Sequence, residues 1–355
     1  MSTTPRKDRA WAEVDLGHLL ANARTIQAVA GCDALLPMVK AEAYGLGALA
    51  VVHALEPLDP WGFGLATIDE AIALREAGVG RRLLVFTPPR VEFAGVYEEF
   101  DLTAVMDHSA VAAAWTRPYH VEVDTGMGRC GVRWDAEDAL RGCGAGTIEG
   151  VFTHFHSADE GSESVERQWQ RFQRALASLG AVGALVHAAN SAGAWRLKER
   201  LDLVRPGIFL YGGCHAPDLP APKPVLTLRA PVVSIRDIPE GESVSYGATW
   251  VAPGPTRVAT LGIGYADGVS RTVRDRASVL LGGGRRKVVG RVTMDFVMAA
   301  LHEGDTVSVG DVATLVGRSG EEEITIDEFA GWAGTNAYEA LARLGPRVPR
   351  HYVAP

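Results

Sequence analysis

The amino-acid sequence predicts an α/β protein, with an N-terminal (β/α)8 TIM-type barrel and a C-terminal, mostly β domain. Short apolar runs of β type alternate with helix-period segments from about residue 15 to residue 222, which is typical of a parallel sheet with crossover helices. After four prolines between residues 217 and 224, strand patterns follow one another without helices between them. We therefore expect a barrel domain over residues 10–225 and a β domain formed by residues 226–355 together with residues 1–9.

Eight apolar runs supply the strands of the predicted barrel. Eight βα units in roughly 200 residues match a closed barrel, which places its chemistry at the carboxyl ends of its strands. The eight runs span residues 35–39, 62–66, 83–87, 102–105, 120–123, 149–153, 185–188 and 203–204. In the second domain we expect strands at 225–235 and 258–263, a hairpin that joins 278–281 to 287–294 through a turn at 282–284, and further strand pattern over 305–316.

The composition excludes several classes of partner. The 355-residue chain has a formal net charge of −8, which argues against nucleic acid and anionic membranes, because those surfaces recruit clustered Lys and Arg. We expect no signal peptide and no membrane-spanning segment. The four cysteines form no CxxC pair, so neither a metal site nor a disulfide framework is expected. These features favour a cytoplasmic protein that acts on a small molecule.

Lys40 ends the first apolar run, and the chain has only four other lysines. A lysine in a half-buried pocket has a depressed pKa and can bond covalently to an aldehyde, either a carbonyl substrate or pyridoxal phosphate (PLP). Surface pairing with Glu42 or Asp69 is the alternative, and position alone favours it. Tyr44 follows in a glycine-containing loop, where a phenol and backbone amides can meet a phosphate.

The loops after the seventh and eighth strands are the usual phosphate site of such barrels. The sequence places Asn190 and Ser191 in the first of these loops, with Ser191 at an expected helix N-cap, and Gly207 in the second. A phosphorylated ligand is one interpretation, and a simple helix cap and turn is the other.

Arg205 follows the eighth strand, so its guanidinium is expected to point into the barrel mouth. A pyridine nitrogen, a phosphate or a carboxylate would accept its hydrogen bonds there, and a salt bridge within the barrel rim is the alternative. His154 and His187 belong to the ends of the sixth and seventh strands. Together with Arg205 they could form a polar relay.

A glycine pattern after the fifth strand has a competing interpretation. Gly126, Gly128 and Gly131 match the GxGxxG pattern of dinucleotide-binding proteins. We do not favour it, because the pattern follows the fifth strand rather than the first, and because Asp124 and Arg129 add charge where a pyrophosphate needs bare amides.

Tyr265 in the second domain leaves the strand at 258–263 within the motif GIGYADG. A tyrosine beside Gly and Asp is ordinarily a turn residue, and proton transfer by its phenol requires neighbouring cations to lower its pKa from about 10. Met294 and Asp295 are expected to end another strand, where the Met294 amide can bind a carboxylate.

Taken together, these motifs resemble the alanine racemase family over nearly the whole chain. Ten stretches in the order and spacing of the family are highly specific. They are VKAEAYGLG at 39–47, FGLATIDEAIALREAG at 63–78, VDTGMGRCG at 123–131, THF at 153–155, HAANSAGA at 187–194, then VRPGIFLYG, VSYGATW, IGYADG, GRVTMD and RVPR.

The resemblance implies a homodimer with shared active sites that interconverts L- and D-alanine, a supply of D-alanine for peptidoglycan. Lys40 would hold PLP and act as one base, and Tyr265 from the other subunit would act on the opposite face, as inversion at Cα requires. Arg205 would meet the pyridine nitrogen and keep it unprotonated, which discourages side reactions.

The same resemblance assigns further roles. Tyr44, Ser191, Gly207 and Ile208 would bind the PLP phosphate, with Asn190 beside them. Arg129 would bond the phenolic oxygen of the cofactor and, with Met294, hold the substrate carboxylate. His154 and His187 would lie near the ring and Arg205, with His154 lowering the pKa of Tyr265, and Glu122 and Asp295 would support the site.

Two positions depart from the family pattern. Glu122 stands where many members have a lysine that becomes carbamylated, so we expect its permanent negative charge to orient Arg129 without CO₂. Pro346 stands where a phosphate-binding tyrosine is common, and proline has neither hydroxyl nor N–H. The phosphate then has one ligand fewer, or Tyr352 or water replaces it.

Three alternatives remain at this point. A non-catalytic PLP-binding protein also uses a barrel and a PLP-bound lysine, but it lacks the second domain that carries IGYADG and GRVTMD. A racemase of serine or of several amino acids is closer, and an amino-acid decarboxylase of similar architecture is more distant.

Overall fold

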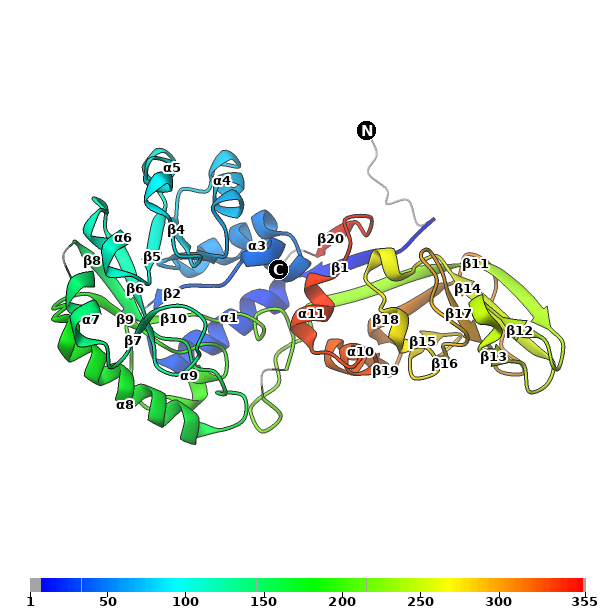
Figure 1. The fold of residues 1–355 in the computed structure, drawn as a ribbon. Coiled ribbons are helices and arrows are strands. Elements are labelled where there is room, and N and C mark those ends of the chain that lie inside the picture. Colours follow the sequence, from blue (N-terminus) through cyan, green and yellow to red (C-terminus); the bar gives the residue numbers. More distant parts are fainter. Residues whose placement is uncertain (1–7, 33, 145, 215, 354–355) are drawn as a thin grey trace. The chain divides into compact units, whose positions relative to one another are not determined.

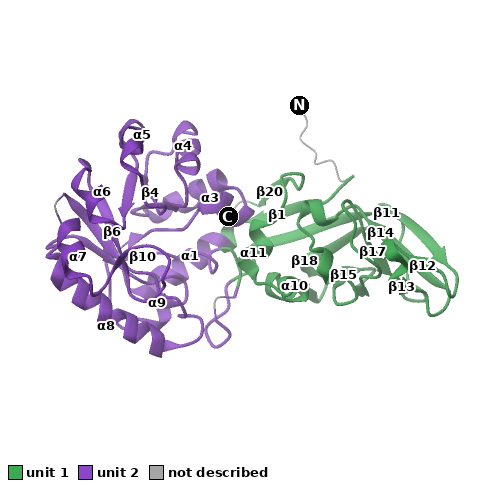
Figure 2. Ribbon diagram, in the orientation of Figure 1, with its two compact units in different colours: residues 1–18, 211–213, 223–355 green, residues 19–210, 214–222 purple. Residues whose placement is uncertain are grey.

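The computed structural model describes residues 8–353 apart from residues 33, 145 and 215, and it contains two compact units (Figure 2). The first, here the barrel unit, comprises Leu19–Leu210 and Cys214–Pro222. The second, here the β unit, comprises Met1–His18, Tyr211–Gly213 and Lys223–Pro355. Residues 1–7, which the sequence assigns to the β domain, lie outside the described residues.

Eight parallel strands form a nearly closed barrel, which confirms the predicted fold class (Figure 1). Their order is β2-β10-β9-β8-β6-β5-β4-β3, and the chain after β2 closes the ring because the amide of Val39 donates to the carbonyl of Gly64 at 2.9 Å. The strands are β2 (Ala34–Leu35), β3 (Gly62–Leu65), β4 (Arg82–Val85), β5 (Thr103–Met106), β6 (Tyr119–Asp124), β8 (Ile148–Phe152), β9 (Leu185–His187) and β10 (Leu203–Val204), with the short β7 (Val132–Arg133) beside β6.

The helices that connect these strands begin and end at recognisable signals. Thr67 and Glu70 form a capping box at the start of α4, and Gly180 adopts a left-handed conformation directly after α8. The connecting helices are α1 (Leu16–Ala30), α2 (Lys40–Gly45), α3 (Ala48–Leu55), η1 (Glu56–Leu58), α4 (Ile68–Glu76), η2 (Val91–Phe93), α5 (Ala94–Glu99), α6 (Ser109–Ala113), α7 (Glu137–Cys143), α8 (Ser162–Leu179) and α9 (Gly193–Arg196).

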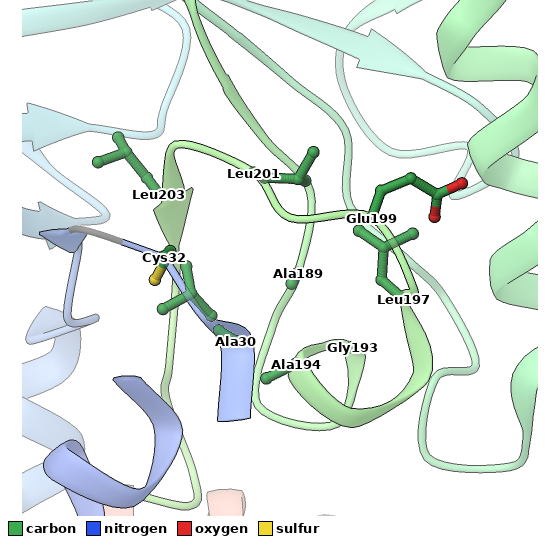
Figure 3. A pocket seen from close by; sticks show the side chains of 10 residues that line it. Ala30, Cys32, Ala189, Gly193, Ala194, Leu197, Glu199, Leu201 and Leu203 are labelled. Carbon is green, nitrogen blue, oxygen red and sulfur yellow. The ribbon is translucent and has the colours of Figure 1, made fainter. Parts of the chain in front are cut away.

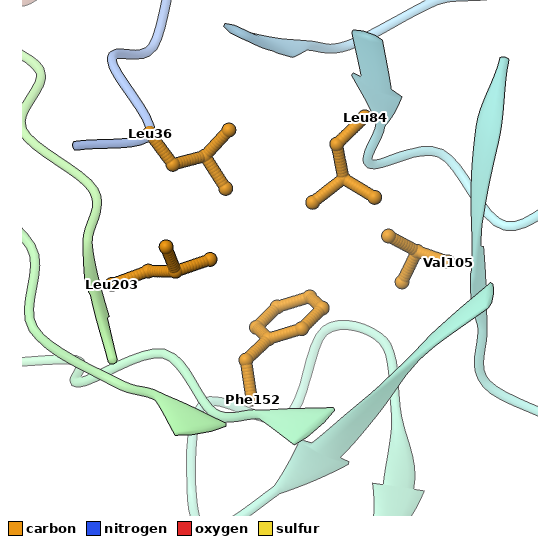
Figure 4. Packing of buried hydrophobic residues seen from close by; sticks show 5 residues of the cluster. All are labelled: Leu36, Leu84, Val105, Phe152 and Leu203. Carbon is orange, nitrogen blue, oxygen red and sulfur yellow. The ribbon is translucent and has the colours of Figure 1, made fainter. Parts of the chain in front are cut away.

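The interior of the barrel holds a compact apolar cluster. Leu36, Leu84, Val105, Phe152 and Leu203 come from different strands or strand ends and point toward one another (Figure 4). Strands buried on both faces are mostly apolar, which is why they are visible in the sequence as apolar runs, although β6 and β8 also carry polar residues. The packed interior leaves the carboxyl ends of the strands as the place for polar side chains.

The β unit contains a sheet in the order β16-β15-β18-β11-β1-β20, with β14 beside β11, β17 beside β14 and β19 beside β18. The strands are β1 (Trp11–Asp15), β11 (Leu226–Ile238), β12 (Ser243–Val244), β13 (Trp250–Val251), β14 (Thr256–Leu261), β15 (Ser278–Leu281), β16 (Gly284–Lys287), β17 (Val297–Ala300), β18 (Val312–Ser319), β19 (Glu322–Ile324) and β20 (Arg350–Val353). The helices are η3 (Tyr246–Ala248), η4 (Tyr265–Asp267), η5 (Arg271–Val273), α10 (Ile326–Ala333) and α11 (Ala337–Ala342).

Two details of the predicted β domain are wrong. The return strand of the hairpin is β16 rather than residues 287–294, because Gly282 and Gly283 both have positive φ and form a two-residue turn that pairs Leu281 with Gly284. Met294 and Asp295 do not end a strand, since residues 290–296 are irregular and β17 begins at Val297. Among the helices of the described residues, none is both long enough and apolar enough to cross a membrane.

Candidate active site

The turn that carries Lys40 has an unusual backbone. Four consecutive residues after Lys40, from Ala41 to Tyr44, have φ between 51° and 56°, so α2 is a left-handed turn. This conformation costs roughly 1–2 kcal/mol per residue other than glycine, and tertiary contacts must stabilise it.

Glu70 on α4 supplies those contacts. One of its carboxylate oxygens accepts from the amide of Ala41 at 2.6 Å, and the other accepts from the amides of Ala66 and Thr67 at 2.8 and 3.1 Å. The side chain of Glu42 also accepts from the amide of Ala48 at 3.2 Å. The left-handed turn is therefore anchored at both ends by carboxylates.

The amine of Lys40 is partly buried in a cationic environment. Burial lowers the pKa of Lys40, and the positive charges of Arg129 and Arg205 lower it further, while Glu70 opposes them. Among the described residues Lys40 forms no ion pair with Glu42 or Asp69, so the surface pairing considered from the sequence is not formed. A lysine in this setting has an increased neutral fraction and can act as a nucleophile or a base.

Tyr44, Ser191 and Gly207 lie together at the carboxyl end of the barrel. A Cβ built on Gly207 would lie 2.4 Å from the phenolic oxygen of Tyr44, so only glycine leaves room for that ring. The hydroxyl of Ser191 accepts from the amides of Gly207 at 3.0 Å and Phe209 at 3.4 Å. Ile208 between them is fully buried.

Ser191 is not the helix N-cap that the sequence suggested. Helix α9 begins at Gly193, whose amide donates to the side-chain oxygen of Asn190 at 2.9 Å. The side-chain nitrogen Nδ2 of Asn190 donates to the carbonyl of Phe155 at 3.3 Å. Asn190 thus fixes the loop, and the Ser191 hydroxyl turns toward Gly207 instead.

Arg205 is almost completely buried among hydrogen-bond acceptors. Its guanidinium donates to Nδ1 of His187 at 2.9 Å, to the carbonyl of Thr153 at 2.8 Å and to Nδ1 of His154 at 3.3 Å. Burial lowers the pKa of Arg205 to about 9, which still leaves it charged at neutral pH. Burial and the charge of Arg205 lower the pKa of His154 to about 3 and that of His187 well below its ordinary value, so both rings are neutral.

Glu122 and Arg129 face each other across the loop after β6. Glu122 is buried, and its carboxylate lies 3.9 Å from the guanidinium of Arg129, which is half exposed. Burial raises the pKa of Glu122, whereas Arg129 and Arg205 oppose that shift. Asp124 accepts from the amides of Gly126 and Gly128, and β7 rather than a helix follows the glycines, so the dinucleotide-binding interpretation fails.

The predicted residues of the β unit also come together. The amide of Tyr265 donates to the carbonyl of Thr293 at 2.9 Å, and that of Ala266 donates to the carbonyl of Met294 at 3.1 Å. The Asp295 carboxylate accepts from Arg347 at 2.9 Å, which holds the Met294 loop in place. The side chains of Tyr265 and Met294 remain 42% and 52% exposed.

Sequence reasoning missed three polar groups: His120 inside the barrel, Glu149 near the start of β8, and Glu70 on α4. A histidine at the start of the strand run at 120–123 was the available signal for His120, since buried polar groups require partners. The capping-box spacing of Thr67 and Glu70 was the available signal for Glu70, but it predicts only the start of a helix and not the contact with the Ala41 amide.

A small pocket elsewhere in the barrel unit lies beside β10 and α9 (Figure 3). It has a volume of about 10 Å³ and is lined mostly by aliphatic side chains, with Cys32 and Glu199 at its edge. This volume holds no more than about one water molecule. None of the predicted site residues lines it, so it is not a substrate site.

The fold and the site together define the class of this protein. It is a barrel protein with a mostly β second domain, and a reactive lysine and a buried arginine stand at the carboxyl ends of the barrel strands. Residues 14–215 match the family model described as alanine racemase, N-terminal domain, and residues 225–352 match alanine racemase, C-terminal domain. The chain belongs to the alanine racemase family.

Individual relatives are similar over almost their whole length. Alanine racemase of Carboxydothermus hydrogenoformans is 41% identical, with 97% of this chain and 99% of the relative covered, and that of Symbiobacterium thermophilum is 39% identical, with 96% of each covered. Alanine racemase of Bacillus anthracis with bound L-Ala-P has a TM-score of 0.90 and 32% identity, covering 99% and 96% of the two chains. The enzyme of Bartonella henselae with covalently bound pyridoxal phosphate has a TM-score of 0.90 and 27% identity, covering 98% and 100%.

Proposed function

We propose that this protein is a PLP-dependent alanine racemase that interconverts L- and D-alanine and supplies D-alanine for peptidoglycan. The observation that carries the proposal is that the half-buried amine of Lys40 and the buried guanidinium of Arg205 lie at the same end of the barrel, where burial and neighbouring positive charges lower the pKa of Lys40. Full-length similarity to alanine racemases supports the choice of substrate.

The residues present fit PLP. The amine of Lys40 suits the aldehyde, and Arg205 offers a donor for a ring nitrogen. The Ser191 hydroxyl, the Tyr44 phenol and the bare backbone at Gly207 form a cradle that a single Cβ would fill, which suits a phosphate. Asn190 fixes the loop that carries Ser191, and Ile208 is fully buried next to Gly207.

PLP bound at Lys40 supplies an electron sink that acidifies the Cα proton of an amino acid. The Lys40 amine moves a proton on one face of Cα, and Tyr265 of the partner subunit moves one on the other face, because inversion needs two bases on opposite sides. Burial and nearby cations favour neutral Lys40, the form that can accept a proton.

Arg205 would limit how strongly bound PLP withdraws electrons from Cα. Its guanidinium has only donors, so it would hold a pyridine nitrogen in the unprotonated, hydrogen-bond-accepting form. By keeping that nitrogen unprotonated, Arg205 would favour return of the proton to Cα over side reactions. The neutral rings of His154 and His187 accept from Arg205 and fix its orientation.

Further residues complete the proposed site. Glu122 lies beside Arg129 and would orient it. Arg129 would bond the phenolic oxygen of the cofactor and the substrate carboxylate. The backbone amide of Met294 holds the same carboxylate, and Asp295 fixes the Met294 loop through Arg347.

The protein acts as a homodimer in this proposal, and the domain at 226–355 supplies Tyr265 to the partner subunit. The exposure of Tyr265, Met294 and Phe296 on one pair of loops supports this, since exposed apolar clusters mark interaction surfaces. In a dimer the partner subunit would cover these exposed side chains.

The test is spectroscopic and enzymatic. The purified protein is expected to show the visible absorption band of lysine-bound PLP, which borohydride abolishes, and to convert L-alanine to D-alanine faster than it converts L-serine. Lys40→Ala should remove the band and the activity, whereas Lys198→Ala, a change at an exposed lysine, should alter neither. A wild-type protein without the band would refute the cofactor, and faster turnover of serine would refute the substrate.

A further inference from the structure

Four polar side chains form a row through the barrel, from the partly exposed Glu149 near the start of β8 to the buried Arg205 beyond β10. Nδ1 of His187 lies 2.9 Å from the Arg205 guanidinium, and Nε2 of His187 lies 2.8 Å from Nδ1 of His120. Nε2 of His120 lies 3.8 Å from the carboxylate of Glu149. His120 and His187 are fully buried, and Glu149 is partly exposed.

The chemistry of arginine fixes every proton in this row. Because a guanidinium can only donate, Nδ1 of His187 must accept, and a neutral His187 therefore carries its proton on Nε2. That proton is donated to Nδ1 of His120, so the single proton of a neutral His120 stands on Nε2. The opposite order would leave His187 with two acceptor nitrogens and a negative charge, which a buried imidazole does not carry.

The last donor of the row points toward a carboxylate. Within the described part of the chain, Nε2 of His120 is a buried polar atom without a hydrogen-bond partner. A buried donor without an acceptor is costly, and the Glu149 carboxylate is 3.8 Å away on a partly exposed side chain that can rotate to close the gap. His120 also holds the pKa of Glu149 below its usual range, which keeps the carboxylate charged.

The packing around the row is built for these rings. A Cβ on Gly150 would lie 2.4 Å from the His120 ring, so that glycine makes the space the ring occupies. Phe152 stacks on His187 with ring centroids 4.9 Å apart and lies under the Arg205 guanidinium at 4.9 Å. These apolar contacts exclude water, which strengthens each hydrogen bond in the row.

We infer that Glu149, His120 and His187 form a proton-ordered hydrogen-bond relay that positions Arg205, with Glu149 as a positioning residue at its far end. A cation at one end and a carboxylate at the other polarise both imidazoles in the same direction, and such hydrogen bonds strengthen one another. The relay transfers no proton; it fixes the guanidinium. Its benefit to catalysis rests on the proposed function, whereas the proton order does not.

The first test measures the proton order directly. Long-range proton–nitrogen correlation spectra of the holoenzyme labelled with ¹⁵N in its histidine side chains should show His120 and His187 as neutral rings protonated on Nε2 at neutral pH. Their ring protons should appear far downfield and exchange slowly with solvent. A ring protonated on Nδ1, or an imidazolium, at either position would overturn the relay even if the protein is an active racemase.

The second test removes the terminal charge. Glu149→Gln should shift the His120 ring proton upfield and lower kcat roughly threefold to tenfold with unchanged KM, because a charge-assisted hydrogen bond is roughly twice as strong as a neutral one. Glu166→Gln, at an exposed position of α8, is the matched control and should change neither. An unshifted proton or an unchanged kcat would overturn the positioning role of Glu149.

The two tests separate this inference from the proposed function. Histidine spectra with the expected protons in a protein that lacks racemase activity would refute the function and leave the proton order standing.

If Glu149→Gln folds poorly, His120→Gln replaces it. The side-chain oxygen of the new glutamine still accepts a hydrogen bond from His187, so the Nε2 proton of His187 should stay in place.

Discussion

Adding one methyl group at Gly207 tests the cradle that we assign to the PLP phosphate. In Gly207→Ala the new Cβ would lie 2.4 Å from the Tyr44 phenolic oxygen and 3.2 Å from its Cζ, and the next contact, with Met38, is at 4.0 Å. The clash is therefore with one side chain. Tyr44 has little freedom to move, because it is buried and ends a left-handed turn held by Glu70.

The size of the effect follows from this geometry. The distance from the new Cβ to the Tyr44 oxygen is about 1 Å shorter than an ordinary van der Waals contact. Overpacking of this kind typically costs about 1–3 kcal/mol. Because roughly 1.4 kcal/mol corresponds to a tenfold change in an equilibrium constant, the Kd for PLP should rise between roughly fivefold and 150-fold in Gly207→Ala. Gly80→Ala, where a Cβ meets nothing within 4 Å, is the matched control and should bind PLP like the wild type.

The assay is titration of the cofactor-free protein with PLP, followed by fluorescence. Removing the clashing oxygen should relieve most of the defect, so the double variant Tyr44→Phe/Gly207→Ala should bind PLP about as well as Tyr44→Phe alone. Wild-type affinity in Gly207→Ala, or purely additive effects in the double variant, would show that Tyr44 and Gly207 do not meet at the phosphate site.

Three other perturbations address the shared site, the buried histidines and the unusual carboxylate. Lys40→Ala and Tyr265→Phe should each be nearly inactive, but an equal mixture allowed to exchange subunits should recover about a quarter of wild-type activity, since half of the random dimers have one intact site of two. The pKa of His154 is about 3 in the folded chain, below its ordinary 6.5, so its stabilising contribution is complete above pH 6.5 and is lost as the pH falls from 6.5 toward 3. Between pH 7.5 and pH 5.5 the free energy of unfolding of the wild type should therefore fall by about 1.4 kcal/mol more than that of His154→Gln. Urea denaturation of the cofactor-free proteins measures both. Glu122→Gln should lower kcat/KM up to roughly tenfold through misplacement of the half-exposed Arg129, and bicarbonate should not restore it.

Controls give each of these three outcomes a definite meaning. No recovery in a mixture whose subunits have demonstrably exchanged would place Lys40 and Tyr265 of one site on the same chain. His53→Gln, at an exposed ring, should keep the full loss of stability at low pH, and an equal loss in His154→Gln would mean that His154 is not held neutral. Glu137→Gln, at an exposed carboxylate, should keep wild-type kinetics, and equal kinetics in Glu122→Gln would remove Glu122 from the site.

Most of the barrel could be predicted because its strands are short, apolar and separated by helical segments. Each of the eight predicted runs overlaps an observed strand, including the two-residue β10, although β2 ends at Leu35 rather than at Val39. Lys40 and Arg205 were identified for the same reason, since each directly follows a run whose carboxyl end must lie at the mouth of a barrel. The hairpin at 278–294 was placed incorrectly because three consecutive glycines leave the register of a turn open, and only pairing with β15 fixes it.

The left-handed turn after Lys40 could not be predicted. Alanine, glutamate and tyrosine have no intrinsic preference for positive φ, so no local signal exists. The conformation depends on Glu70, whose carboxylate reaches an amide 29 residues earlier in the chain. The role of Ser191 was misjudged for a similar reason, because its hydroxyl pairs with the loop after β10 rather than with its own helix.

The sequence by itself determined the alternation of strands and helices, the division into barrel and β domain, and the set of reactive side chains at the strand ends, because these are carried by local patterns of polarity and residue type. Only the tertiary structure decided which of those side chains meet. It brought His120 of β6 against His187 of β9 and Arg205 after β10, and it gave Arg205 acceptors that fix the proton on each ring. Hydrogen bonds between distant strands depend on barrel closure and register, and neither is encoded in any single stretch of the chain.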